Sequence, residues 1–108
     1  MNQILNQIAI ITGGATGIGL GIANVLGQNG AKIFILDIDS QEGEKAINYL
    51  KNRNIEASLI IVDITIEKEI EKTINQIIAK TGKIDILINN AGITGKTGSI
   101  TETSVEEM

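Results

Sequence analysis

Short runs of apolar residues recur along the chain at nearly equal intervals. Four such runs cover residues 8–11, 33–36, 59–62 and 84–88, and they start 25, 26 and 25 residues apart. Most of the runs are continuous rather than alternating, which is typical of strands that are buried on both faces of a sheet. The pattern therefore predicts four buried β-strands.

Hydrophobic residues between these runs recur at helical spacing. The spacing predicts three helices, which cover about residues 17–28, 41–52 and 66–80. Ser40 and Thr65 are expected to cap the second and third helices at their N-termini. Asn29-Gly30 and Thr81-Gly82 are expected to end the first and third helices.

The alternation of strands and helices predicts an α/β fold, a doubly wound parallel sheet with the strand order 3-2-1-4. Ligands bind such a sheet at the carboxyl ends of its strands, between the first and fourth strands. The fourth strand is expected to form an uncovered apolar edge. A glycine-containing loop (92–98) follows, and residues 104–107 have the form of a capping box, which predicts a helix from about Val105. Residues 1–108 are therefore interpreted as the amino-terminal portion of a single, incomplete domain.

Composition argues against several classes of function. The net charge is −4 and Arg53 is the only arginine, so no basic patch is expected to bind nucleic acid. The chain has neither cysteine nor histidine, so disulfides are excluded and no metal site is expected. No apolar run approaches the roughly 20 residues of a membrane-spanning helix, and the first residues lack the basic start of a secretory signal. We therefore expect a cytoplasmic protein without a membrane partner.

A glycine-rich segment lies between the first predicted strand and the first predicted helix. Its spacing is Gly13-x3-Gly17-x-Gly19, which differs from Gly-x-Gly-x-x-Gly. Glycines let the backbone approach a pyrophosphate closely, and a helix N-terminus adds unpaired N–H groups and partial positive charge. The segment predicts a nucleotide site, and the alternative is a tight turn without a ligand.

Polar residues follow each of the other three predicted strands. Asp37, 18 residues after Gly19, is placed to accept hydrogen bonds from both hydroxyls of an adenosine ribose. Asp63 is a candidate acceptor for an adenine amino group. Asn89-Asn90-Ala91-Gly92 ends the fourth strand, with amides that can tie strands together and small residues against which a cofactor can lie. The alternative for each position is an ordinary turn or helix cap.

Taken together, these four elements resemble the short-chain dehydrogenase/reductase family. Thr12-Gly13-x-x-x-Gly17-Ile18-Gly19 resembles its nucleotide fingerprint, Asp63-Ile64 its adenine contact, and Asn89-Asn90-Ala91-Gly92 its sheet-stabilising and cofactor-contacting motif. The resemblance implies a Rossmann-type fold. It also implies an oxidoreductase that transfers hydride reversibly between a nicotinamide cofactor and a small carbonyl or alcohol substrate, working as a homodimer or homotetramer.

The resemblance implies a role for each motif residue. The turn would line the pyrophosphate and its ribose, Asp37 and Ile38 would lie at the adenosine ribose, and residues 63–64 would frame the adenine. Residues 90–92 would lie by the ribose near the nicotinamide. The implied cofactor residues are Gly13, Ala15, Thr16, Gly17, Ile18, Gly19, Asp37, Ile38, Asp63, Ile64, Asn90, Ala91 and Gly92.

Asp37 favours NAD over NADP. Two unit charges about 4 Å apart repel by about 4 kcal/mol at an effective dielectric near 20, before screening by salt. A 2′-phosphate beside Asp37 would meet this repulsion. NADP-using members of the family often carry a basic residue before the middle glycine or after the second strand, where this chain has Thr16 and Ile38.

No residue of the chain is assigned to catalysis. The family uses a Tyr acid/base with a Lys four residues later, together with a Ser and an Asn. The only tyrosine here, Tyr49, precedes the 89–92 motif and is followed four residues later by Arg53. The chain alone is therefore expected to be inactive. The alternative is a truncated or vestigial nucleotide-binding protein; the glycine spacing and the 89–92 motif disfavour another Rossmann-type protein such as a methyltransferase.

Overall fold

The computed structural model describes residues 4–90 and 102–103 of the chain. Strands and helices alternate as the sequence predicts, with one additional short strand near the end. In order, the elements are β1 (Ile8–Thr12), α1 (Gly17–Gln28), β2 (Lys32–Asp37), α2 (Ser40–Lys51), β3 (Ala57–Ile61), α3 (Glu67–Thr81), β4 (Ile86–Asn89) and β5 (Glu102–Thr103). The first helix has the predicted bounds.

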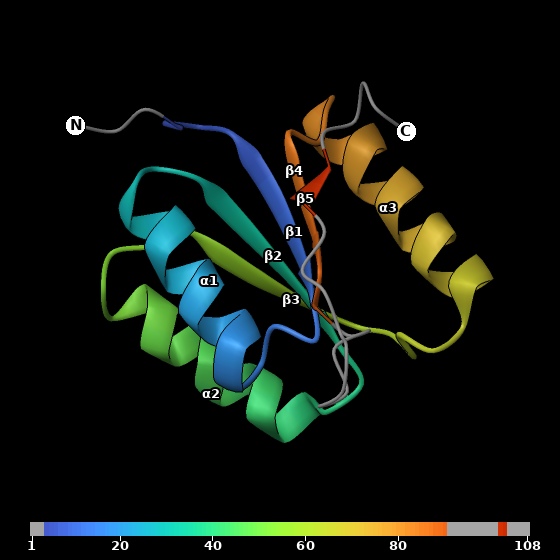
Figure 1. Cartoon of the computed structure of the whole chain (residues 1–108), viewed down its shortest axis with the longest axis horizontal. Coiled ribbons are helices and arrows are strands. Elements are labelled where there is room, and N and C mark those ends of the chain that lie inside the picture. Colours follow the sequence, from blue (N-terminus) through green and yellow to red (C-terminus); the bar gives the residue numbers. More distant parts are fainter. Residues whose placement is uncertain (1–3, 91–101, 104–108) are drawn as a thin grey trace.

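The strands form one sheet in the order β3-β2-β1-β4-β5 (Figure 1). Strands β1 to β4 are parallel, and β1 pairs with β2 up to Thr12–Leu36 and with β4 up to Thr12–Asn89. The predicted Rossmann-type α/β fold and the strand order 3-2-1-4 are confirmed. Because the four strands run in one direction, their last residues share one border of the sheet, here called the carboxyl edge. Their first residues share the opposite border, the amino edge.

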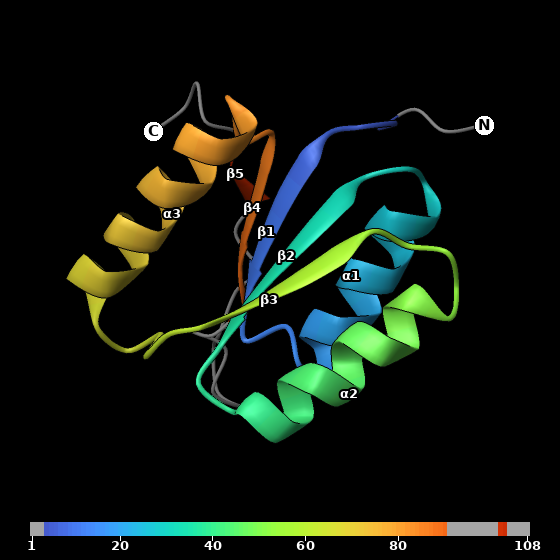
Figure 2. The same cartoon turned by 180° about the vertical axis from the view of Figure 1, so that it is seen from behind.

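Helices cover the sheet on both faces. α1 and α2 lie on one face and α3 lies on the other (Figures 1 and 2). Successive residues of a strand point to opposite faces. Accordingly, Ile11 and Ile35 belong to the core under α1 and α2, whereas Ile10 and Phe34 belong to the core under α3. All five residues of β1 are buried, so both cores hold the central strand in place.

The helix caps differ from the prediction. Ser40 is the first residue of α2 rather than its cap, because the Oδ1 of Asp39 accepts the N–H of Glu42 at 3.0 Å. Thr65 does not cap α3, whose N-cap is Ile66 without a side-chain hydrogen bond. Gly82 ends α3 in the left-handed conformation, as predicted.

The prediction that the fourth strand is an uncovered edge is wrong. β5 pairs antiparallel with β4, with Thr103 opposite Leu87 and Glu102 opposite Ile88. The loop glycines and the helix predicted from Val105 lie outside the described residues. Among the helices that the structure describes, none has both the length and the apolar character needed to span a bilayer.

Candidate functional site

The glycine-rich turn lies at the carboxyl edge, between β1 and α1. Gly13 and Gly17 have φ angles of 65° and 58°, a region that glycine enters at little cost. The N–H of Gly13 donates to the carbonyl of Leu36 at 2.7 Å, so the turn leaves β1 while still bonded to β2. Thr16, the N-cap of α1, makes no side-chain cap hydrogen bond, and the first turn of α1 has no acidic residue. No side chain of these residues therefore competes with an external anion for the N–H groups that begin α1.

Gly17 and Gly19 of the motif differ in what a side chain at each position would meet. A Cβ atom at Gly19 would lie 2.5 Å from the carbonyl oxygen of Gly13 and 2.7 Å from the Nδ2 of Asn90, so α1 can pack under the turn only with glycine there. A Cβ atom at Gly17 would meet nothing within 4 Å. A turn glycine, an open glycine and a packing glycine are what a dinucleotide turn requires, so the residues present fit a dinucleotide cofactor.

Asp37 ties the glycine turn to the end of β2. Its Oδ2 accepts the N–H of Ala15 at 3.2 Å, and its Oδ1 accepts the N–H of Asp39 at 3.1 Å. A carboxylate offers about four acceptor positions, of which these bonds use two. The remaining positions suit the two hydroxyls of a ribose, and the carboxylate stands directly beside the turn.

Asp63 forms a local turn. Its Oδ1 accepts the hydroxyl of Thr65 at 2.6 Å and the N–H of Thr65 at 3.0 Å. The hydroxyl bond, and then the backbone bond, hold the pKa of the Asp63 carboxyl below its usual value. Ile64 is half-buried and packs against the core under α3. The turn that the sequence offered as an alternative is thus present, and the adenine contact stays a prediction.

The two asparagines at the end of β4 bind the neighbouring strand and its turn. The hydroxyl of Thr12 donates to the Oδ1 of Asn89 at 3.1 Å, and the Nδ2 of Asn90 donates to the carbonyl of Gly13 at 3.0 Å. Ala91 and Gly92 lie outside the described residues. The turn is therefore held from both sides, by Asp37 on β2 and by Asn90 after β4.

Two isoleucines are exposed near this site. Ile18 in the first turn of α1 is 57% exposed, and Ile38 after β2 is 58% exposed. Tyr49, by contrast, lies on α2, where the guanidinium of Arg53 stacks 4.6 Å from its ring centroid. Apolar side chains thus accompany the turn, whereas the only tyrosine belongs to the surface of a helix.

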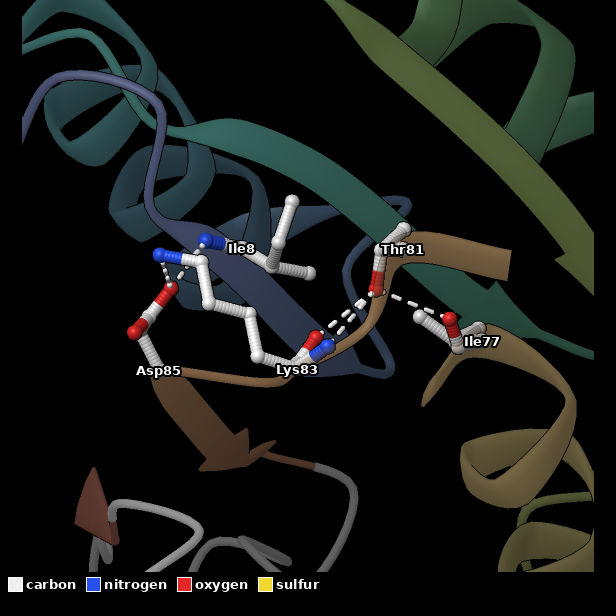
Figure 3. A network of polar contacts seen from close by, with 5 residues as sticks. All are labelled: Ile8, Ile77, Thr81, Lys83 and Asp85. Atoms are coloured by element: carbon white, nitrogen blue, oxygen red, sulfur yellow. Dashed lines mark hydrogen bonds and ion pairs between the residues drawn. The ribbon is translucent and has the colours of Figure 1, made fainter. Parts of the chain in front are cut away.

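A polar network at the amino edge was not anticipated from the sequence. The Oδ2 of Asp85 accepts the N–H of Ile8 at 2.8 Å and lies 2.9 Å from the Nζ of Lys83 (Figure 3). Burial raises the pKa of Asp85, but the hydrogen bond from Ile8 together with the bond and charge of Lys83 outweighs it, so the pKa is lowered. The hydroxyl of Thr81 lies 2.8 Å from the carbonyl of Ile77 and 2.7 Å from that of Lys83. The network therefore joins the start of β1 to the end of α3 and the approach to β4.

Known proteins share both the sequence and the fold. Residues 7–108 match the family model of the short chain dehydrogenases. Short-chain dehydrogenase reductase 3a of Arabidopsis thaliana is 37% identical over 103 residues, which cover 94% of this chain and 39% of that protein. This chain thus spans about two fifths of the length of that relative.

Two solved structures extend the comparison to cofactor complexes. NAD+-bound xylitol dehydrogenase superposes with a TM-score of 0.78 at 32% identity, covering 86% of this chain and 36% of that one. A metagenomic short-chain oxidoreductase in complex with NADP also gives 0.78, at 29% identity, covering 84% of this chain and 42% of that one. With the match to the family model over nearly its entire length, this chain belongs to the short-chain dehydrogenase/reductase family.

Proposed function

We propose that this chain binds NAD and forms the cofactor-recognising part of an oxidoreductase that transfers hydride between the nicotinamide and a small carbonyl or alcohol. The observation that carries the proposal is the bond from the N–H of Ala15 to Asp37. This bond sets a carboxylate for the ribose beside a turn that offers backbone N–H groups to the pyrophosphate. The cofactor, when bound, supplies the hydride chemistry; the chain's own residues bind and orient it.

The preference for NAD rests on charge, because similar folds are known with either cofactor. None of the ion pairs between described residues involves Asp37, so no described cation lies directly against its carboxylate. Thr16 and Ile38 supply no positive charge either. A 2′-phosphate placed near Asp37 would be repelled, whereas a ribose diol would be bound.

We further propose that residues 1–108 are one portion of a single nucleotide-binding domain and have no turnover of their own. Tyr49 is stacked under Arg53 on α2 and cannot serve as an acid/base beside the turn. In the proposed enzyme, substrate binding and proton transfer belong to other residues of a cytoplasmic homodimer or homotetramer.

The proposal is tested by NMR titration of the isotope-labelled chain with NAD. We expect the amide resonances of residues 13–19 to shift, and those of Lys83 and Asp85 at the amino edge to stay in place. A folded sample whose turn amides ignore saturating NAD would overturn the proposal. Oxidation of NADH by the chain with a carbonyl substrate would overturn the prediction of inactivity and leave the binding proposal intact.

A further inference from the structure

The outer strand β3 has one unpaired side. β3 ends the sheet, with β2 as its only neighbour in the described part of the chain. The carbonyl of Glu56 accepts from Ile33 and the N–H of Val62 donates to Asp37, so the even-numbered residues of this segment turn their backbone groups toward β2. Because backbone groups alternate along a strand, Ala57, Leu59 and Ile61 turn theirs outward.

The usual protections of a sheet edge are missing from this strand. β3 reads Ala-Ser-Leu-Ile-Ile, without a charge or a proline, and its pairing with β2 is regular. Ser58 is exposed and Ile61 is 50% exposed. Hollows flank the strand on both faces of the sheet, about 450 Å³ against α2 and about 380 Å³ against α3. Natural proteins commonly block an unpaired strand with charge, proline or a bulge, so an open edge of this kind indicates an interface.

We propose that β3 pairs antiparallel with β3 of a second copy of this chain, about a twofold axis at Leu59. Leu59 then faces Leu59 of the other copy, and Ala57 faces Ile61. Each of these pairs exchanges two backbone hydrogen bonds, so every outward group of the strand is satisfied. No other register of two identical strands pairs all three outward residues. The proposal does not rest on cofactor binding.

The walls of the two hollows favour an identical partner. The α2 wall carries Glu44 and Lys51, and the α3 wall carries Glu69 and Lys72. A twofold axis places the α2 wall of one subunit opposite the α2 wall of the other, and the α3 walls likewise. The acidic residue of each wall can then pair with the basic residue of the same wall in the other subunit. An extended peptide of a single charge sign would be repelled by one member of each wall, which makes it the poorer occupant.

The first test measures the mass of the chain in solution by light scattering during size exclusion, over a range of concentrations. We expect a dimer whose dissociation constant rises about tenfold or more in Ser58→Lys. In the proposed register, residue 58 of each copy lies opposite Ile60 of the other, so the dimer would contain two unfavourable contacts between lysine and isoleucine. Ser58→Thr is the matched control and should keep the dimer. A monomer at every concentration, an open-ended series of larger species, or a Ser58→Lys dimer of undiminished strength would overturn the proposal.

A second test fixes the register and does not depend on Ser58→Lys remaining folded. The chain has no cysteine, so Leu59→Cys introduces a single thiol at the axis. Opposed residues of a hydrogen-bonded pair have Cα atoms about 5.5 Å apart, within the reach of a disulfide. We expect mild oxidation to cross-link Leu59→Cys and to leave the control, Asn75→Cys on the outer side of α3, largely monomeric. Equal cross-linking of the two variants would overturn the register.

Discussion

Two carboxylates at opposite edges of the same sheet differ in their charged partners. Asp85 at the amino edge accepts a backbone N–H from the start of β1, and Asp37 at the carboxyl edge accepts one from the turn after β1. Lys83 lies against Asp85, whereas no described ion pair reaches Asp37. The first carboxylate is paired with a cation and ties the start of β1 to the loop before β4. The second lies at the edge where we propose that the cofactor binds.

The backbone shows the same contrast. At the amino edge, short polar bonds join the start of β1 to the loop before β4 and fix the position of β1. At the carboxyl edge, glycines replace side chains, and the first N–H groups of α1 have no side-chain cap. The polar network and the proposed cofactor site thus lie at opposite ends of the strands, and open parallel α/β sheets usually bind their ligands at the carboxyl ends.

Substitution of Gly19 by alanine should break the carboxyl edge most severely. The new Cβ would lie 2.5 Å from a backbone oxygen that cannot swing away, so we expect a loss of about 2–3 kcal/mol in unfolding free energy. NAD affinity should fall as well, because the turn must shift away from α1. Urea denaturation and calorimetric titration measure the two effects.

Gly21 provides the matched control in the same helix. A Cβ there would meet nothing within 4 Å, so Gly21→Ala should raise the unfolding free energy by about 0.5–1 kcal/mol through helix propensity. NAD affinity should stay unchanged. Equal effects of the two alanines would contradict the packing role of Gly19.

Substitution of Asp85 by asparagine should loosen the amino edge. The change removes a charged acceptor from the N–H of Ile8 and the partner of Lys83, so we expect a loss of about 1.5–2 kcal/mol at neutral pH. Since the pKa of Asp85 is lowered in the folded state, its contribution is present above the unfolded pKa and is lost as pH falls through the folded one.

The pH dependence supplies the check on Asp85. Urea denaturation of wild type and variant should differ at pH 7 and converge in acid, below about pH 4. Lys83→Met tests how much of the effect comes from the ion pair, and we expect a smaller loss, because Lys83 is 53% exposed. A difference between wild type and Asp85→Asn that persists unchanged in acid would rule out this linkage.

Substitution of Asp37 by asparagine tests the charge that distinguishes the carboxyl edge. Asparagine keeps an acceptor for the N–H of Ala15 but removes the negative charge. We expect NAD to bind more weakly and the ratio of NAD to NADP affinity to fall by about tenfold. Tenfold corresponds to about 1.4 kcal/mol, which is less than half of the repulsion of about 4 kcal/mol expected without screening. Calorimetric titration with both cofactors measures the ratio. Asp39→Asn, which changes a neighbouring carboxylate, should leave the ratio in place.

Local patterns were sufficient to predict most of the fold. The continuous apolar runs gave the parallel strands, and glycine at positions 13, 17 and 19 gave the position of the turn. The N-cap of α2 was predicted at Ser40 and lies one residue earlier, at Asp39. Aspartate and serine are both favoured N-cap residues, so the sequence alone does not choose between the two positions.

The contacts that hold the site depend on tertiary structure. The donor to Asp37 is the backbone N–H of Ala15, which any residue except proline supplies, so the side chain at position 15 gives no sign of this bond. Asp85 and Ile8 are 77 residues apart, and only the pairing of β1 with β4 brings them together. A lysine and an aspartate in Lys83-x-Asp85, just before a strand, is the one local sign that was available.

Substitution of Thr65 by valine should have the smallest effect and sharpens the comparison of carboxylates at the carboxyl edge. The carboxylate of Asp63 accepts both of its described hydrogen bonds from Thr65, two residues away, whereas the carboxylate of Asp37 accepts one of its two from the separate turn. Valine removes the hydroxyl and keeps the backbone N–H, so the pKa of Asp63 should rise toward its ordinary value while staying below it. An NMR titration that follows the carboxyl resonance of Asp63 measures this change. A pKa of Asp63 that stays as low as in the wild type would mean that the hydroxyl of Thr65 is not its main cause.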